Sequence, residues 1–315
     1  MEGPVLLFGG PYSNLNATQA LLREARRLGI PPGRTICTGD VVAYCGRPAE
    51  TVGAIRAAGI HVVMGNCEES LGWESPDCGC GFAEGTACER MAVEWYAYAN
   101  RAISPDDRAW MRGLPRRIDI ALGGRRLAVV HGSVGRINRF VFASSPEELK
   151  RAEIDLAGTD GVVGGHCGLP FTQTPGGRLW HNPGAIGLPA NDGTPRAWFS
   201  LLTPLRGGLR VEHRALDYDH AGEARAMRRA NLAGGYADAL ESGLWPSCGV
   251  LPPGEAARRS KPLTPETVRW TPSAGRRPPS SIPVRGISAA RLTAGSPGHP
   301  VKGHKPPATN KLIRF

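Results

Sequence analysis

Long apolar segments are missing from this chain of 315 residues, and aromatic residues make up only 6% of it. No apolar run approaches the roughly 18 residues that a membrane-spanning helix needs. The first residues, MEGPVLLFGG, include an acidic residue where a secretory signal would be basic. We therefore expect no membrane span and no Sec export, and we predict a cytoplasmic protein.

Several common catalytic motifs are also missing. The stretch His131-Gly132-Ser133-Val134-Gly135 has His where the G-x-S-x-G nucleophile elbow requires Gly. The chain has neither the P-loop pattern G-x-x-x-x-G-K-S/T nor an H-E-x-x-H pair. These absences argue against a serine hydrolase of that type, a P-loop nucleotide hydrolase and a zinc peptidase.

The net charge of +10 is concentrated at the C-terminal end of the sequence. Residues 255–315 contain twelve Lys and Arg residues and two acidic residues, so the preceding residues are neutral overall. Ten prolines and only two aromatic residues in this segment leave little apolar surface for a core. We predict one domain over residues 1–250 and a basic, Pro-rich disordered tail over 251–315. Such a tail either contacts polyanions such as RNA, DNA or lipid weakly or has no specific partner.

The eight cysteines are interpreted as thiols or metal ligands before disulfides, as is usual inside cells. Cys78, Cys80 and Cys88 form a C-x-C-x7-C pattern, and Cys67 adds a fourth thiol nearby in the sequence. Four thiolates suffice for a closed zinc site, although the usual paired C-x-x-C spacing is missing. Two interpretations stay open: a second metal site for zinc or iron, and buried or redox-active thiols.

Strand and helix signals alternate along the chain. Apolar runs predict strands, and apolar residues at helical spacing predict helices over residues 17–28 and 49–58. The predicted strands are 5–8, 35–37, 61–64, 127–130, 161–163, 179–181, 197–202 and 209–211. This alternation predicts an α/β protein with a mostly parallel sheet covered by helices, and the β-rich second half adds a further sheet.

Four of these apolar runs are each followed by a side chain that can bind a metal ion. Asp40 follows ICTG, Asn66 follows VVMG, His131 follows LAVV and His166 follows VVGG. In open α/β sheets the ligand site lies beyond the carboxyl ends of the strands, so these side chains can converge. Oxygen and imidazole ligands suit a divalent ion such as manganese, iron, nickel or zinc. The alternative is a set of hydrogen-bonded framework residues.

Five motifs resemble those of the calcineurin-like metallophosphoesterase superfamily, in the family order. They are GDVVAYCGRPAE (39–50), GNCEE (65–69), VVHG (129–132), GGHCGLPF (164–171) and NPGAIG (182–187). The resemblance covers about residues 4–240. It implies a four-layer α/β/β/α sandwich of two mixed β-sheets and the hydrolysis of phosphate mono- or diesters with two divalent ions.

The resemblance also implies roles for individual residues. Asp40 would bridge the two ions, and Asn66, His131 and His166 would complete the shell of the second. Cys67 stands where the general acid of the family is often His, as it does in a prokaryotic phosphodiesterase branch. Asp40, Asn66 and Cys67 are therefore the catalytic candidates. Glu68 and Glu69 have two interpretations, an acid or supporting partner of the site and exposed loop charge, and the second is favoured.

The sequence departs from the family pattern at three ligand positions, and all three belong to the first ion. The D-x-H-x-N motif corresponds to residues 10–14, where Gly10 replaces Asp and Tyr12 replaces His. In the last motif, G-H-x-H, Gly168 replaces the second His. We predict a degenerate site that holds one ion rather than two. Candidates for contacts to the phosphoryl group are Tyr12, Asn14, Arg136 and Arg139, since an Arg fork can clamp phosphoryl oxygens; a packed ring and solvated charges are the alternative.

Two functions from different classes follow. The first is a metal-dependent phosphoesterase-like hydrolase that acts on a phosphorylated small molecule or another phosphoester through a metal-bound water. The second is a non-catalytic regulator, descended from the same family, that binds a metal or a phosphorylated ligand. A third interpretation, a nucleic-acid-binding protein, depends on the tail alone.

Overall fold

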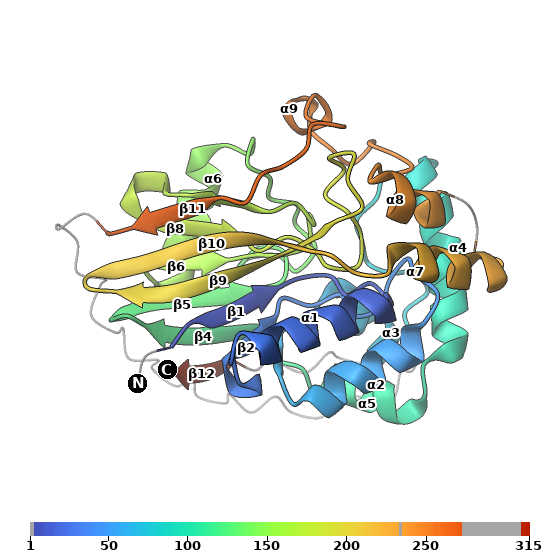
Figure 1. The fold of residues 1–315 in the computed structure, drawn as a ribbon, viewed down its shortest axis with the longest axis horizontal. Helices are drawn as coiled ribbons and strands as arrows, with labels where there is room; N and C mark the ends of the chain where they lie inside the picture. Colours follow the sequence, from blue (N-terminus) through green and yellow to red (C-terminus); the bar gives the residue numbers. More distant parts are fainter. Residues whose placement is uncertain (1–2, 233–234, 273–309) are drawn as a thin grey trace, which may run out of the picture.

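The computed structural model describes residues 3–232, 235–272 and 310–315. Within these residues, twelve strands form two six-stranded mixed sheets (Figure 1). Sheet one has the order β11-β10-β9-β1-β2-β3, and sheet two has the order β12-β4-β5-β6-β8-β7. The strands of sheet one are β1 (Val5–Phe8), β2 (Thr35–Cys37), β3 (His61–Val62), β9 (Ala197–Leu205), β10 (Gly208–Leu216) and β11 (Thr267–Trp270). Those of sheet two are β4 (Arg117–Leu122), β5 (Arg125–Val130), β6 (Gly161–Val163), β7 (Phe171–Gln173), β8 (Leu179–Asn182) and β12 (Asn310–Arg314).

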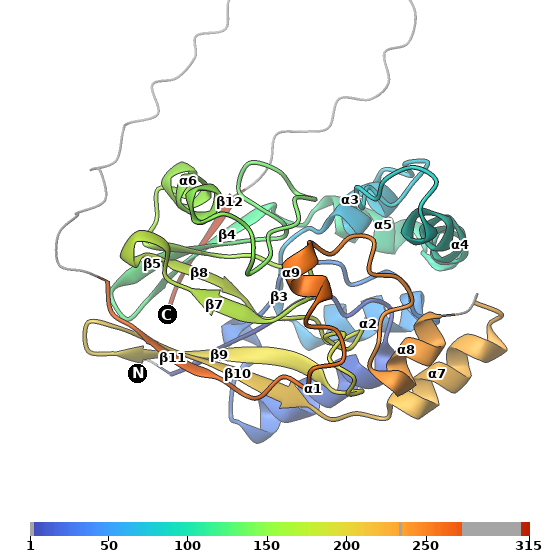
Figure 2. The ribbon, with the colours of Figure 1, turned by 90° about the horizontal axis from the view of Figure 1, so that it is seen from above.

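Helices cover the outer faces of both sheets (Figure 2). Helix α6 lies on sheet two, whereas α1 and α2 lie on sheet one. The helices of the described residues are α1 (Leu15–Arg27), α2 (Pro48–Ala58), α3 (Asn66–Gly72), α4 (Ala87–Ala102), α5 (Pro105–Arg112), α6 (Glu147–Ala157), α7 (His220–Arg229), α8 (Tyr236–Ser242) and α9 (Pro253–Ala256). The predicted four-layer α/β/β/α sandwich of two mixed sheets is confirmed.

The apolar strand runs alternate between two cores, because successive side chains of a strand point to opposite faces. In β1, Val5 and Leu7 pack between the sheets, whereas Leu6 and Phe8 pack in the cluster that contains the α1 and α2 side chains. A strand that is buried on both faces is continuously apolar, as β1 is. The polar residues that follow such a strand are therefore held at the edge of a rigid layer.

Strands β11 and β12 correct the prediction of a disordered tail beginning at residue 251. β11 pairs antiparallel with β10, and the Trp270 indole N–H donates to the Gly177 carbonyl oxygen at 3.0 Å. β12 pairs parallel with β4, and the Phe315 ring lies 5.0 Å from the Arg34 guanidinium carbon. These segments cannot build a core themselves, but they pack on a core built by the rest of the chain. The remaining part of the predicted tail, residues 273–309, lies outside the described residues.

Deletion of residues 310–315 is expected to lower the free energy of unfolding by roughly 2 kcal/mol, because Ile313 and Phe315 pack partly buried against the core between the sheets. Urea unfolding of the full-length and shortened proteins measures this difference. Equal stabilities would show that β12 contributes nothing to the fold.

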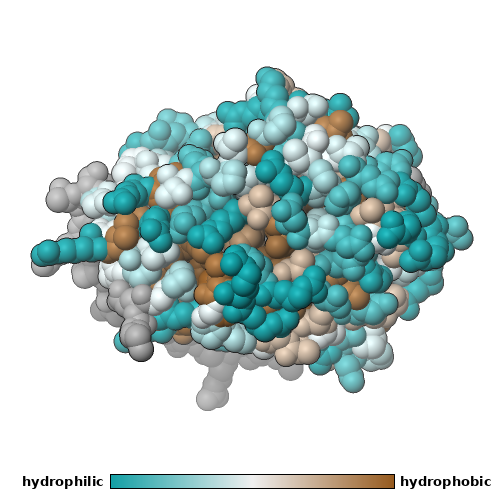
Figure 3. Space-filling view, viewed as in Figure 1, coloured by the Kyte–Doolittle hydropathy of each residue, from teal (hydrophilic) through white to brown (hydrophobic). Residues whose placement is uncertain are grey.

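The surface of the sandwich is mainly hydrophilic on the face that Figure 3 shows. Val93, Leu156 and Leu312 are the exposed large hydrophobic residues of the described part of the chain. None of the helices in that part combines the length and the apolar character needed to cross a membrane.

A polar bridge crosses the space between the two sheets. His181 of β8 shares hydrogen bonds with the Thr172 hydroxyl at 2.9 Å and with the Ser200 hydroxyl of β9 at 2.7 Å. Thr172 also contacts His213 Nε2 of β10 at 2.8 Å. Burial lowers the pKa of both imidazoles, that of His213 to about 4. Both histidines are therefore neutral at pH 7 and serve as framework residues.

Acidification is expected to destabilise the fold through this bridge. Below pH 6.5 the unfolded chain binds a proton on His213, whereas the folded chain does not until the pH approaches 4. Stability therefore falls as the pH falls through this window, by roughly 2 kcal/mol between about pH 7 and pH 5 for His213 alone. Urea unfolding at both pH values measures the loss, and His213→Gln should reduce it. A variant with the same pH dependence as the wild type would contradict this assignment.

Candidate metal centre

Four loops at the carboxyl ends of neighbouring strands bring the predicted site residues together. Asp40 follows β2, Asn66 begins α3 after β3, His131 follows β5 and His166 follows β6. All four side chains are buried. The ligand atoms of Asp40, His131 and His166 lie within 4.8 Å of one another, and within the described ranges these three form the one group of at least three His, Cys, Asp or Glu residues so arranged. The strand ends converge here because two sheets contribute them, β2 and β3 from one and β5 and β6 from the other.

His131 is the centre of this cluster. Its Nδ1 lies 2.7 Å from the Thr38 carbonyl oxygen, which can only accept, so Nδ1 carries the proton and Nε2 presents a lone pair. Nε2 lies 3.2 Å from Asp40 Oδ2 and 3.0 Å from both Asn66 Oδ1 and His166 Nδ1.

The Asn66 amide also directs an acceptor atom, its Oδ1, toward the cluster. Its Nδ2 donates to the Cys78 carbonyl oxygen at 2.9 Å, which leaves Oδ1 directed at His131. Three acceptor atoms, on Asp40, Asn66 and His131, thus face one another beside His166 Nδ1, whose role as donor or acceptor depends on its tautomer. Such an arrangement repels itself unless a cation or a proton occupies the centre. The residues present therefore fit a divalent cation.

Asp40 carries the negative charge of this centre. Burial alone would raise the pKa of Asp40, but the adjacent His131 and His166 hold it well below its usual value. Burial lowers the pKa of His131, yet the Asp40 carboxylate outweighs burial and raises it. Asp40 is therefore an anion in this setting.

Backbone geometry at two of the four positions is unusual. Asp40 and His166 have φ values of 55° and 58°, in the left-handed region that favours glycine. Such conformations cost free energy and are kept mainly where they position functional groups. Here they turn both side chains back over the strand ends.

Glu68 supports the centre from beneath, contrary to the interpretation of exposed loop charge. Its side chain is fully buried and accepts hydrogen bonds from the backbone N–H groups of Asp40 at 2.8 Å, Gly65 at 3.0 Å and Val42 at 3.3 Å. Burial, and next the Asp40 carboxylate, raise the pKa of Glu68 to about 7. The sequence held a signal for this role, because Glu at the third position of a helix commonly bonds back to the residue that precedes the helix. Glu69 is also buried and forms an ion pair with Arg116.

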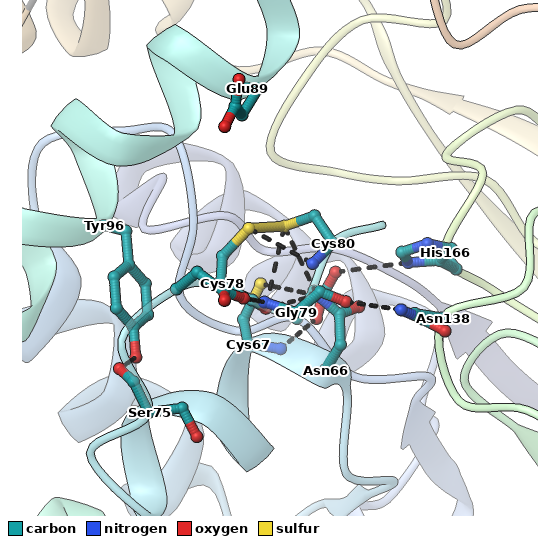
Figure 4. Close-up of a disulfide and its surroundings, with 12 residues drawn as sticks. Asn66, Cys67, Ser75, Cys78, Gly79, Cys80, Glu89, Tyr96, Asn138 and His166 are labelled. Atoms are coloured by element: carbon teal, nitrogen blue, oxygen red, sulfur yellow. Dashed lines mark hydrogen bonds and ion pairs between the residues drawn. A yellow bond between two sulfur atoms is a disulfide. The ribbon is translucent and has the colours of Figure 1, made fainter. Parts of the chain in front are cut away.

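The cysteines do not form the predicted second metal site. Cys78 and Cys80 are joined in a disulfide (Figure 4), and Cys88 is a free buried thiol. In the part of the chain that the structure describes, no cysteine belongs to a group that could hold an ion. The C-x-C loop instead borders the centre, because its carbonyl groups at positions 78 and 79 accept from Asn66 and from Asn138 at 2.8 Å.

Cys67 lies in α3 beside the centre. Its backbone N–H donates to Asp40 Oδ1 at 3.2 Å, and its thiol lies 3.5 Å from Asn66 Nδ2. Burial, and then the Asp40 and Glu68 carboxylates, raise the pKa of the thiol well above its usual value, so it keeps its proton at pH 7. Its role as a general acid stays a prediction.

Three of the four predicted phosphoryl contacts have other partners. Asn14 caps α1, since its Oδ1 accepts from the Ala17 N–H at 3.0 Å while its Nδ2 donates to the Gly187 carbonyl oxygen at 3.0 Å. Arg139 pairs with the buried Glu153 of α6 at 2.7 Å, and Arg136 donates to Asn138 at 2.9 Å. Asn14 and Arg139 therefore have partners within the framework, and their contacts to a phosphoryl group stay predictions. Arg136 is exposed, which agrees with the alternative of solvated charge.

Tyr12 is the one predicted contact that faces the centre. It lines a pocket of about 50 Å³ together with His166, Cys167 and Gly168. Aromatic side chains form much of the remaining wall: Tyr44, Phe82, Phe140, Tyr236 and Trp245. Of the four candidate ligands, His166 therefore borders this pocket.

The motifs and the geometry agree with a comparison with known families. The profile of the calcineurin-like phosphoesterase superfamily domain matches residues 13–203, which is more than half of the chain. The chain belongs to this superfamily. Members of the superfamily are generally phosphoester hydrolases that bind divalent metals.

Individual relatives of this calcineurin-like protein are distant. An uncharacterised protein of Methanocaldococcus jannaschii is 24% identical over 226 residues, which are 66% of this chain and 85% of that protein. A metallophosphoesterase from Sphaerobacter thermophilus has 22% identity and a TM-score of 0.61 over 78% of this chain and 100% of its own. A hypothetical protein from Pyrococcus horikoshii has 18% identity and a TM-score of 0.65 over 76% of this chain and 98% of its own. These two structures share the fold of this chain.

Proposed function

We propose that this protein is a metal-dependent phosphoester hydrolase that works with a single divalent ion. The observation that carries the proposal is the convergence of Asp40 Oδ2, Asn66 Oδ1 and His166 Nδ1 on His131 Nε2. Acceptor atoms that face one another in a buried site repel unless a cation or a proton lies among them. Manganese, iron, nickel and zinc all accept such mixed oxygen and imidazole ligands.

The four ligands would hold the ion, which when bound supplies Lewis-acid stabilisation of a phosphoryl oxygen and a lowered pKa for a water molecule. Around it, the residues of the chain bind and orient. The Thr38 carbonyl oxygen fixes the tautomer of His131. A metal-binding imidazole is usually oriented by such a hydrogen bond from its other ring nitrogen. Glu68 holds the backbone of Asp40 and Gly65 in place. The aromatic wall of the pocket excludes bulk water from the phosphoryl group.

Calorimetric titration of metal-free protein with Mn²⁺ tests the ion site, and we expect saturation at one ion per chain. Hydrolysis of p-nitrophenyl phosphate and bis(p-nitrophenyl) phosphate with Mn²⁺ or Zn²⁺ then tests the reaction. Absence of saturable binding would contradict the proposal. Ion binding without turnover of either ester would instead favour the non-catalytic regulator, which Gly10, Tyr12 and Gly168 also suit because they remove the first ion's ligands.

A further inference from the structure

The three positions that depart from the family pattern lie against one another. A Cβ atom added at Gly10 would overlap with the Tyr12 ring. A Cβ atom added at Gly168 would lie 3.5 Å from the Tyr12 hydroxyl oxygen. The loops after β1 and β6 thus carry glycine at positions 10 and 168, and the Tyr12 ring lies between these two glycines.

The Tyr12 ring is held firmly in this place. Its side chain is 5% exposed and meets the Tyr44 ring edge-on, with 4.8 Å between ring centroids. Its backbone N–H donates to the Asp40 carbonyl oxygen at 3.1 Å, and its carbonyl oxygen accepts from the Cys45 N–H at 3.1 Å. The backbone of Tyr12 is therefore tied directly to that of a candidate ligand.

The residues of this region do not fit the first ion of the family. Gly10 and Gly168 offer no ligand atoms, and the Tyr12 ring takes the volume into which a side chain at position 10 would project. By contrast, all four residues expected to hold the second ion converge. The three departures are compatible with one another, since an aspartate at position 10 cannot stand beside this ring.

The Tyr12 hydroxyl is available to donate a hydrogen bond to a molecule in the pocket. Within residues 3–232, 235–272 and 310–315 it has no hydrogen-bond partner, and Tyr12 lines the same pocket as His166 and Gly168. A phenol hydroxyl is a neutral donor, and hydrogen bonds to charged acceptors are stronger than those between neutral groups.

We propose that the Tyr12 side chain replaces the first ion: its ring excludes that ion, and its hydroxyl donates a hydrogen bond to an oxygen of the phosphoryl group. This rests on the proposed function, because it needs one ion held by the four remaining ligands. One neutral hydrogen bond takes over part of the stabilisation that a cation supplies in relatives with two ions.

The first test uses Tyr12→Phe, which removes only the hydroxyl. With Mn²⁺ saturating, we expect wild type and variant each to bind one ion per chain, and inorganic phosphate to bind the variant about 10-fold more weakly. Tyr98→Phe is the matched control, because the Tyr98 hydroxyl bonds to the Gly46 carbonyl oxygen and does not line the pocket. Its phosphate affinity should equal that of the wild type.

The second test rebuilds the first ion site with the triple variant Gly10→Asp, Tyr12→His, Gly168→His. We expect two Mn²⁺ ions per chain by calorimetry and by elemental analysis. A folded triple variant that still binds one ion, or a wild type that binds two, would overturn the exclusion of the first ion. If the triple variant does not fold, the number of Mn²⁺ ions bound by the wild type tests the exclusion of the first ion, and Tyr12→Phe tests the role of the hydroxyl.

The outcomes separate this inference from the proposed function. One ion in the wild type with unchanged phosphate affinity in Tyr12→Phe overturns the role of Tyr12 and leaves the single-ion hydrolase standing. No Mn²⁺ binding by the wild type contradicts both.

Discussion

His131→Ala is expected to weaken Mn²⁺ binding by more than about 100-fold and to reduce phosphoester turnover at least as strongly, because even residues behind a ligand change metal affinity or activity by about 10- to 100-fold. His131 Nε2 is the atom that each of the other three candidate ligand atoms approaches. Its loss removes one ligand and leaves the remaining acceptors without a common centre.

The measurement is the thermal unfolding temperature with and without Mn²⁺. An ion that binds only the folded state at 100 times its Kd stabilises by about 2.7 kcal/mol, and this gain should disappear in His131→Ala. Asp40→Asn should behave in the same way while keeping an acceptor for the Cys67 N–H. His220→Ala, at the start of α7, is the matched control and should retain the full shift. A normal shift in His131→Ala would show that the ion binds elsewhere.

Glu68→Ala is expected to lower the free energy of unfolding by about 3–5 kcal/mol, because it leaves buried backbone N–H groups without an acceptor at about 1–3 kcal/mol each. The groups concerned belong to Asp40, Val42 and Gly65. The same change should weaken Mn²⁺ binding, since the loop that carries Asp40 loses its support.

Urea unfolding at pH 7 measures the loss of stability, and Glu148→Ala on the exposed side of α6 is the control, with an expected change within about 0.5 kcal/mol. Glu68→Gln keeps an acceptor oxygen and should lie between the two. A Glu68→Ala protein as stable as the control would mean that the loops hold their shape without this carboxylate.

Near the motifs, Arg139 and Asn14 have hydrogen-bond partners that the sequence did not predict. Arg139 lies close in sequence to His131, but it reaches α6 and pairs with Glu153. Asn14 belongs to the motif that should contact the ion, yet its Oδ1 accepts a hydrogen bond from the Ala17 N–H at the start of α1. Sequence spacing gives the position of a residue on an element, whereas the contacts of its side chain depend on which elements pack beside it.

For the tail and the cysteines, too, the sequence does not give the contacts that the side chains make. Composition predicts that residues 251–315 cannot build a core, whereas the structure shows Trp270 and Phe315 packed against the core of the domain. Cys78 and Cys80 lie too close in the sequence for their pairing to be predicted from spacing, and the structure joins them in a disulfide beside Asn66. In each case the missing information is the partner, which lies far away in the sequence or depends on the local fold of a loop.

From the sequence alone it followed that apolar strands end in Asp40, Asn66, His131 and His166, because strand periodicity and the order of polar residues after each strand are local properties. The family resemblance, based on its motifs, added the two-sheet sandwich and the prediction that the first ion site is depleted. Only the tertiary structure decided that Glu68 lies beneath the centre, that Tyr12 fills the space between Gly10 and Gly168, and that Asn14 and Arg139 serve the framework. These features depend on contacts between loops from different strands, and such contacts arise when the two sheets pack together.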